Sequence, residues 1–141
     1  MLRPYDEVEQ TVHEVIGCAI EVHRILGPGL LESVYQECLP FELEARGLRF
    51  TSGAPVTIDY KGMAIRSAFK ADFIVEGSVV VELKAVEALH PIHQAQLITY
   101  LKQTGCPAGL LLNFNSVLLR NGLRRLDHPD RYLQKKERSK P

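Results

Sequence analysis

Two acidic residues and a lysine stand at spacings that can bring their side chains together. Asp72 and Glu82 lie at equal distances from Gly77 in the sequence, and Lys84 follows Glu82 by two positions. Alternation along a strand places Glu82 and Lys84 on one face. A hairpin centred on Gly77 places Asp72 directly opposite Glu82. Two carboxylates suit a hard divalent cation such as Mg²⁺ or Mn²⁺, and the ammonium group of Lys84 can orient or polarise an attacking water beside it.

Two other interpretations of this segment stay open at the level of sequence. An isolated Glu-x-Lys pattern is often the solvated face of an amphipathic strand, because charged residues make up about a quarter of an average chain. A tight two-residue turn on Glu76 and Gly77 would pair Asp72 with Val81 and turn the two carboxylates to opposite faces. The register of this hairpin therefore decides whether a shared site exists.

Two helical pairs accompany this segment and complete an ordered set of motifs. Glu32 and Tyr35 are three residues apart in GLLESVY, and Gln96 and Tyr100 are four apart in QLITY, so each pair shares a helix face. The order Gly-x-x-Glu-x-x-Tyr, Asp, Glu-x-Lys and Gln-x-x-x-Tyr resembles that of the GxxExxY proteins of the PD-(D/E)XK nuclease superfamily. The resemblance covers residues 8–126.

The resemblance implies an α/β fold with a restriction-endonuclease-like core. In this core, three antiparallel strands, a helix and a further strand build a mixed central sheet flanked by helices. It implies four catalytic residues, of which the three acids also bind the metal: Glu32, Asp72, Glu82 and Lys84. It implies three residues that position the substrate: Tyr35, Gln96 and Tyr100.

Three features of the chain differ from patterns found in the superfamily. Pro40 interrupts a helix that the family usually continues, and residues 67–68 stand where a glycine often precedes the aspartate strand. Both differences are expected to shift the site only slightly, because neither removes a chemical group. Some superfamily nucleases hold an iron-sulfur cluster on four cysteines, whereas this chain has three in other places, so we expect no cluster.

The motifs together predict a phosphodiesterase that hydrolyses nucleic acid. DNA is the expected substrate, water the nucleophile and Mg²⁺ or Mn²⁺ the cofactor. The alternative is a non-catalytic nucleic-acid-binding or assembly module that retains the nuclease fold, because a fold does not specify a biological task. A nuclease of 141 residues that grips a duplex could act as a homodimer.

Hydrophobic periodicity predicts the elements that must position these side chains. An apolar stripe predicts a helix over residues 6–26, with a capping box from Asp6 to Glu9 and a stop at Gly27. A second helix is expected over residues 29–47, with a kink or break before Pro40 because proline removes a hydrogen bond. The remaining expected elements are strands over 56–60, 63–75 and 79–85, a helix over 91–103, a strand over 109–114, and a strand or hairpin over 117–126. We expect a single domain over residues 1–131 and a basic, frayed tail over residues 132–141.

Composition restricts the class of protein and its location. With 45% hydrophobic residues and zero net charge, the chain differs from disordered and from histone-like proteins. Acidic residues gather in residues 1–47 and basic residues in residues 120–141, so contact with a polyanion is expected at the C-terminal end. The chain has three cysteines without a C-x-x-C pair, no signal-peptide apolar region and no spanning segment, so we expect a cytoplasmic location and no membrane association.

Three weaker candidates have simpler interpretations. Gly27-Pro28-Gly29 could cradle a phosphate, but a helix cap is favoured. His90 and His93 could help to bind a metal, but capping of a helix start is favoured. A basic cluster could equally contact phosphates or solvate an exposed sheet edge; it comprises Arg120, Arg124, Arg125 and Arg131.

Overall fold

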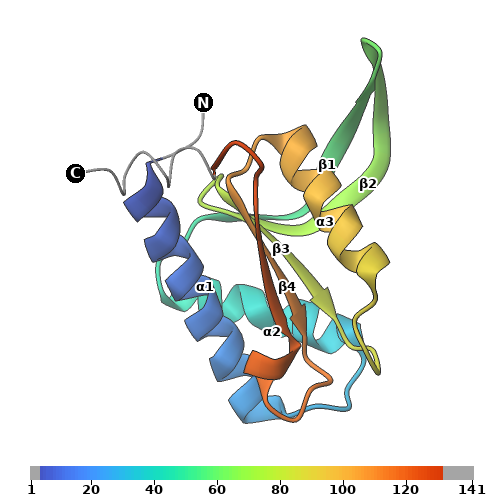
Figure 1. Cartoon of the computed structure of the whole chain (residues 1–141). Coiled ribbons are helices and arrows are strands. Elements are labelled where there is room, and N and C mark those ends of the chain that lie inside the picture. The colour runs from blue at the N-terminus through green and yellow to red at the C-terminus, as the bar shows by residue number, and fades with distance from the viewer. Residues whose placement is uncertain (1–3, 132–141) are drawn as a thin grey trace, which may run out of the picture.

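A five-stranded sheet separates two helices from a third in the part of the chain that the structure describes. This computed structural model describes residues 4–131, except for the side chains at positions 67 and 68. In chain order the elements are α1 (Tyr5–Leu26), α2 (Glu32–Ala45), β1 (Phe50–Tyr60), β2 (Met63–Val75), β3 (Val79–Lys84), α3 (Pro91–Thr104), β4 (Ala108–Asn113), a 3₁₀ turn (Leu119–Gly122) and β5 (Leu123–Asp127). Helices α1 and α2 pack on one face of the sheet and α3 packs on the other (Figure 1).

The strands lie side by side in sequence order, from β1 to β5. β1, β2 and β3 form an antiparallel meander, β3 and β4 are parallel, and β5 is antiparallel to β4. α3 supplies the crossover that a parallel pair requires. This mixed sheet flanked by helices confirms the predicted α/β class and is consistent with a restriction-endonuclease-like fold.

Strand β3 divides the apolar interior into two cores. Its alternate residues Val79, Val81 and Leu83 pack against α1 and α2, whereas Val80 packs on the side of α3. Strands buried on both faces form continuous apolar runs rather than alternating ones. Glu82, only 7% exposed, is therefore an acid inserted into a strand whose other buried residues are apolar.

The hairpin of β1 and β2 extends beyond the layers as an arm, as Figure 1 shows. The register shifts between Val56, which pairs with Phe69, and Ile58, which pairs with Ile65, so β2 holds extra residues between these pairs. A bulge of this kind bends a strand and redirects the side chains beside it. Residues 67–68, where the family often has a glycine, fall within this bulge.

In the first two helices, the predicted capping box was wrong, and of the kink or break expected near residues 36–40 the break is absent. α1 has no capping box: Pro4 precedes the helix, and Asp6 lies in its first turn, where a negative charge favours the positive end of the helix dipole. α2 begins at Glu32 and continues through Pro40 without a break. The helix persists because Leu39 and Leu43, on either side of the proline, are both fully buried in the core.

Of the two alternatives predicted for residues 117–126, the strand is confirmed by β5, whereas the hairpin around Asn121 and Gly122 was wrong. These residues end a 3₁₀ turn, after which β5 pairs with β4. A Cβ atom on Gly122 would lie 2.5 Å from the carbonyl oxygen of Asn113. Glycine therefore permits a close approach of two backbone segments here rather than a tight hairpin turn.

Among residues 4–131, no helix is both long and apolar enough to cross a membrane. The predicted tail, residues 132–141, lies outside the described residues.

Candidate active site

The hairpin of β2 and β3 has the register that brings Asp72 to Glu82. Its ladder pairs are symmetric about Gly77: Phe73 with Val81, Ile74 with Val80, and Val75 with Val79. At the next position, hydrogen bonds from backbone amides to the two carboxylates take the place of backbone pairing between the strands. The Asp72 amide donates to Glu82 Oε2 at 2.6 Å, and the Leu83 amide donates to Asp72 Oδ2 at 2.8 Å. The predicted register is therefore confirmed, and each acid is bound to the backbone of the opposite strand.

Glu82 and Lys84 occupy alternate positions of β3, on the side of the sheet that faces α3. Leu83, between them, packs into the core beneath α1 and α2. Glu82 is buried, whereas Lys84, the last residue of the strand, is half-buried. The ammonium group can therefore meet a ligand from solvent while it stays beside the buried acid.

The first turn of α2 brings a third acid to the hairpin. Glu32 is half-buried, and the charges of Lys84 and Asp72 and the amide of Ala85 all act on its carboxylate. Gln36 follows one turn later, and its Nε2 donates to Glu32 Oε2 and to Asp72 Oδ1, at 3.3 Å in each case. The structure thus ties the predicted acid of α2 to the predicted acid of β2.

Gln36 and Asn113 are two residues of the site that the sequence motifs do not include. The spacing of four between Glu32 and Gln36 is the signal that could have identified Gln36, because such residues share a helix face. Asn113 is buried at the end of β4; its Oδ1 accepts from the Val86 amide at 3.1 Å, and its Nδ2 donates to the Val86 carbonyl at 2.9 Å. This amide fixes the loop that follows Lys84, and no pattern in the sequence indicates it.

Burial and repulsion between acids dominate the electrostatics of the site. Burial, and then the charge of Asp72, raises the pKa of Glu82 to about 8, against the opposing effects of the Asp72 amide and Lys84. Burial also raises the pKa of Glu32, against the opposing charge of Lys84. Both shifts arise because several acids share a space that is shielded from water. A bound cation would favour the ionised form of each acid.

The donor set suits a divalent cation, although it is not preassembled. Glu32, Asp72 and Glu82 supply the oxygen ligands that Mg²⁺ and Mn²⁺ prefer, and Lys84 balances only one of their three charges. Within residues 4–131, no group of three or more histidine, cysteine or acidic side chains has the arrangement of a metal site. One oxygen of Asp72 and one of Glu82 are already bound to backbone amides. A cation would therefore use the remaining oxygens of these two acids.

The residues of the QLITY motif lie on α3, beside the hairpin. Tyr100 is 3% exposed and belongs to the core between α3 and the sheet. Burial, followed by the charges of Glu82 and Asp72, raises the pKa of its hydroxyl to about 12. Gln96 is half-buried and lines a groove together with Tyr100 and Phe69 of β2. Tyr100 is therefore both a core residue and a neighbour of the acids, and Gln96 lies on the same side of α3.

Tyr35 lies in the core rather than at the site. Its ring is fully buried and stacks on Phe114, with ring centroids 4.6 Å apart. Its hydroxyl donates to the Gly27 carbonyl at 2.6 Å and accepts from the Leu30 amide at 3.2 Å. These bonds hold the loop between α1 and α2. Tyr35 can influence Glu32 only by fixing the start of α2, so the structure does not place it where it could contact a substrate.

Gly27 and the two histidines cap helices, as the simpler interpretations predicted. Gly27 ends α1 with a φ of 69°, in the left-handed region that favours glycine. His93 Nδ1 accepts from the His90 amide at 3.1 Å at the start of α3.

The predicted arginine cluster is divided between internal ion pairs and solvent. Arg125 binds Glu9 with both terminal nitrogens, and Arg131, 1% exposed, donates to Glu9 Oε1 at 2.9 Å. Arg120 and Arg124 are exposed. Arg125 and Arg131 therefore neither await a phosphate nor simply solvate a sheet edge. Their ion pairs with Glu9 hold β5 and the residues after it against α1.

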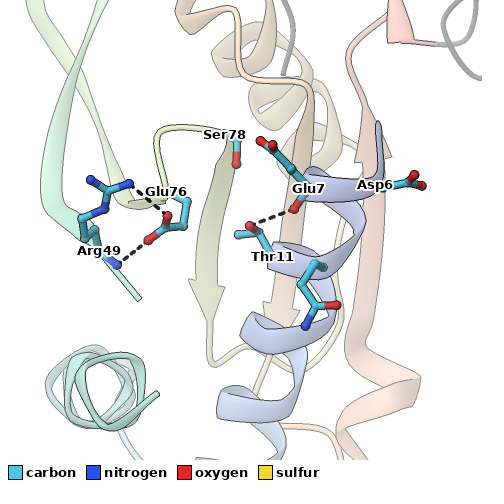
Figure 2. A pocket seen from close by; sticks show the side chains of 7 residues that line it. Asp6, Glu7, Thr11, Arg49, Glu76 and Ser78 are labelled. Atoms are coloured by element: carbon cyan, nitrogen blue, oxygen red, sulfur yellow. Dashed lines mark hydrogen bonds and ion pairs between the residues drawn. The ribbon is translucent and has the colours of Figure 1, made fainter. Parts of the chain in front are cut away.

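A separate cavity of about 490 Å³ lies beside the start of β3, at the opposite end of that strand from Lys84. Figure 2 shows the Glu76 carboxylate turned toward Arg49, whose amide donates to Glu76 Oε2 at 2.6 Å. On the other side, the Thr11 hydroxyl donates to the Glu7 carbonyl. The bond of Thr11 is internal to α1, whereas the bonds between Arg49 and Glu76 hold the turn between β2 and β3.

A family model described as the PD-(D/E)XK nuclease superfamily matches residues 9–126. The matched region contains the whole candidate site: Glu32, Gln36, Asp72, Glu82, Lys84, Gln96 and Tyr100. No curated protein and no solved structure matches the chain significantly.

Proposed function

The chain belongs to the PD-(D/E)XK nuclease superfamily, and we propose that it is a metal-dependent nuclease that hydrolyses phosphodiester bonds in nucleic acid, with DNA as the expected substrate. One observation carries the proposal. Asp72 and Glu82 meet across a single hairpin register, and Lys84 lies two residues further along the same face of β3. A binding module would have no need to bury an acid in an apolar strand at a cost in desolvation.

Each residue has a distinct part in the proposed reaction. Asp72 and Glu82 would hold Mg²⁺ or Mn²⁺ through the oxygens that do not bind backbone amides, and Glu32 would complete the set from α2. Bound there, the cation supplies positive charge opposite the charge that develops on the phosphate. Lys84 orients and polarises the attacking water, because its ammonium group lies beside the acids at the accessible end of β3.

Residues on the two flanking helices position this machinery. Gln36 acts through Glu32 and Asp72, to which it donates. Gln96 and Tyr100 position Lys84 or the nucleic-acid backbone from α3. The hydroxyl of Tyr100 is protonated at neutral pH, as that of an ordinary tyrosine is, so it can donate a hydrogen bond.

We also propose that the chain is one of the GxxExxY proteins within the superfamily. The GLLESVY segment supports this, because it delivers Glu32 to the site and uses Tyr35 to hold the loop in front of α2. Three further predictions remain proposals: that residues 1–131 form one domain, that the protein is cytoplasmic, and that it acts as a homodimer. Free thiols at Cys18, Cys38 and Cys106 favour a reducing compartment.

The proposed activity is tested by incubating the protein with labelled single-stranded, duplex, branched and end-frayed DNA and with the corresponding RNA forms. Each reaction is run with Mg²⁺, with Mn²⁺ and with EDTA. We expect cleavage of at least one DNA form that requires the metal and disappears in EDTA. Cleavage that persists in EDTA, or that Asp72→Ala leaves unchanged, would refute the proposed mechanism.

The second candidate is a non-catalytic nucleic-acid-binding or assembly module. It is favoured by the two acid oxygens that bind backbone amides and by the lack of a preassembled metal group among residues 4–131. Binding of an oligonucleotide without cleavage of any form in the panel, under every metal condition, would favour this module over the nuclease.

A further inference from the structure

We propose that the groove between β2 and α3 receives an unstacked nucleobase next to the scissile phosphate, so that the substrate is single-stranded nucleic acid or a strand with a displaced base. This inference rests on the proposed function and names the substrate class of the same site. The groove has a volume of about 370 Å³, within the range of roughly 300–1,000 Å³ that is usual for small-molecule sites. Its walls combine apolar and aromatic side chains with the polar groups of His93, Gln96 and Thr99; the former include Phe69, Ile92 and Tyr100.

Phe69 provides the flat surface on which a base could stack. Its side chain is 43% exposed, and its ring lies 6.0 Å from that of Tyr100 at 55°, so Tyr100 leaves much of the ring open. Phe69 pairs with Val56, which packs on the α3 side of the sheet. The bulge in β2 directly precedes Phe69, and bulges redirect side chains next to functional sites. Nucleobases of every kind stack on an exposed aromatic face of this type.

The groove opens beside the acids and the lysine of the candidate site. Tyr100, which contacts Phe69, is close enough to Glu82 and Asp72 for their charges to act on its hydroxyl. His93, which also lines the groove, is close enough to Lys84 for the ammonium charge to act on its ring. A nucleotide with its base in the groove would therefore hold its own phosphate near the residues that are proposed to cleave it.

The charge of the arm favours a nucleic-acid strand over a protein segment in this groove. Residues 57–70 of the arm contain three basic residues and one acid, Asp59: the bases are Lys61, Arg66 and Lys70, all exposed. Basic side chains that follow an aromatic surface are typical of proteins that bind single strands, because they contact successive phosphates. A base that is paired and stacked inside a duplex cannot enter such a groove without being displaced.

The inference is tested with a fluorescent reporter, because the chain contains no tryptophan. Phe69→Trp introduces one in the groove, and Phe41→Trp introduces a matched one at an exposed phenylalanine on α2, 72% exposed. Each variant is titrated in EDTA, which prevents cleavage, with a short oligothymidylate and with an oligomer of equal length that carries abasic sites. We expect the oligothymidylate to quench the emission of Phe69→Trp, the abasic oligomer to leave it nearly unchanged, and Phe41→Trp to respond to neither.

A second measurement compares affinities by fluorescence anisotropy. Phe69→Ala should weaken binding of the oligothymidylate about tenfold, Phe69→Tyr should retain it, and Phe41→Ala should bind as the wild type does. A blunt duplex of the same length should bind the wild type more weakly than the single strand. Equal quenching of Phe69→Trp by the base-bearing and abasic oligomers would overturn the base subsite and leave the nuclease proposal standing. Failure of every nucleic acid to bind in EDTA and to be cleaved in Mg²⁺ or Mn²⁺ would overturn both, and tight binding of a second copy of the chain that Phe69→Ala abolishes would assign the groove to self-association.

Discussion

Glu82 is a buried acid in β3, where its neighbours are apolar except for the half-buried Lys84 at the end of the strand. Because its carboxyl group is shielded from water, the stability of the fold depends on pH. In the metal-free protein its pKa is raised from 4.5 to about 8 by burial and by Asp72. The folded state therefore binds a proton more tightly than the unfolded chain does. Stability from this group is fully present below pH 4.5 and falls as the pH rises, until the loss is complete above pH 8.

Glu82→Gln should remove this pH dependence. In EDTA, the free energy of unfolding of the wild type should decline between pH 5 and pH 8, by an amount with an upper bound of about 5 kcal/mol. Glutamine stays neutral and can still accept the hydrogen bond from the Asp72 amide, so the variant should show a flatter profile and higher stability at pH 8. Urea unfolding across this range checks the expectation. Identical slopes for the two proteins would show that Glu82 is not the titrating group.

Substitutions of Asp72 and Lys84 should have different effects on metal binding and on the rate of cleavage. Asp72→Ala removes a ligand, so it should weaken Mg²⁺ or Mn²⁺ binding and abolish cleavage together. Lys84→Ala leaves the acids in place and removes a competing positive charge, so metal affinity should hold or rise while the rate falls by a factor on the order of 10² or more. Calorimetric metal titration beside a cleavage assay measures both quantities. Wild-type cleavage by Lys84→Ala, or unchanged metal binding by Asp72→Ala, would contradict these roles.

Gln36 offers a test of positioning without loss of a charged group. Gln36→Met keeps the size of the side chain and loses the bonds to Glu32 and Asp72. We expect the metal concentration for half-maximal cleavage to rise and the rate to fall about tenfold, with a change in unfolding free energy near 1 kcal/mol. Gln10→Met, on an exposed residue that bonds to Glu14 on α1, is the matched control. An unchanged metal requirement in Gln36→Met would mean that Gln36 is merely structural.

At the residue scale, the sequence predicted well what depends on periodicity. The hairpin symmetry about Gly77 and the alternation along β3 are repeating properties, so they placed Asp72, Glu82 and Lys84 correctly. The helical spacing of Glu32 and Tyr35 predicted a shared face but could not tell what opposes each residue. Phe114, on which Tyr35 stacks, comes from a distant part of the chain, and the Gly27 carbonyl that accepts from its hydroxyl lies outside the helix.

Among the elements, the loop between α1 and α2 depends on Tyr35 for its shape. Tyr35→Phe keeps the stacking on Phe114 and loses the bonds to Gly27 and Leu30. The two unpaired backbone groups should cost about 1–3 kcal/mol of stability. Thermal or urea unfolding measures the loss, and cleavage per folded molecule should change little because Glu32 remains in place. A variant as stable as the wild type would show that these bonds do not hold the loop.

The element predictions failed where tertiary contacts outweigh local signals. Pro40 is a strong local breaker, yet α2 continues because its buried leucines fasten the helix to the core. The Asn121-Gly122 pair is typical of a hairpin turn, yet Gly122 is needed for a close approach to Asn113. Both outcomes depend on which segments pack together, and this information is absent from a local window of sequence.

For the whole molecule, the uneven distribution of charge is partly cancelled inside the fold. The acidic first part and the basic last part of the chain meet where Glu9 binds Arg125 and Arg131. These arginines are less available to a polyanion than the sequence suggested. The bases of the arm, Lys61, Arg66 and Lys70, are in contrast all exposed.

The central claim is that the acids of the hairpin cleave nucleic acid with a divalent cation. Its most direct test is the single-turnover cleavage rate of the best DNA substrate in Mg²⁺, for the wild type, Asp72→Asn, Glu82→Gln and Glu37→Gln. Glu37 is an exposed acid on α2, so its variant controls for the loss of an acid elsewhere. We predict that the two hairpin variants lose at least about 10² in rate, that Glu37→Gln cleaves as the wild type does, and that EDTA abolishes every activity. Wild-type rates in both Asp72→Asn and Glu82→Gln would contradict the account.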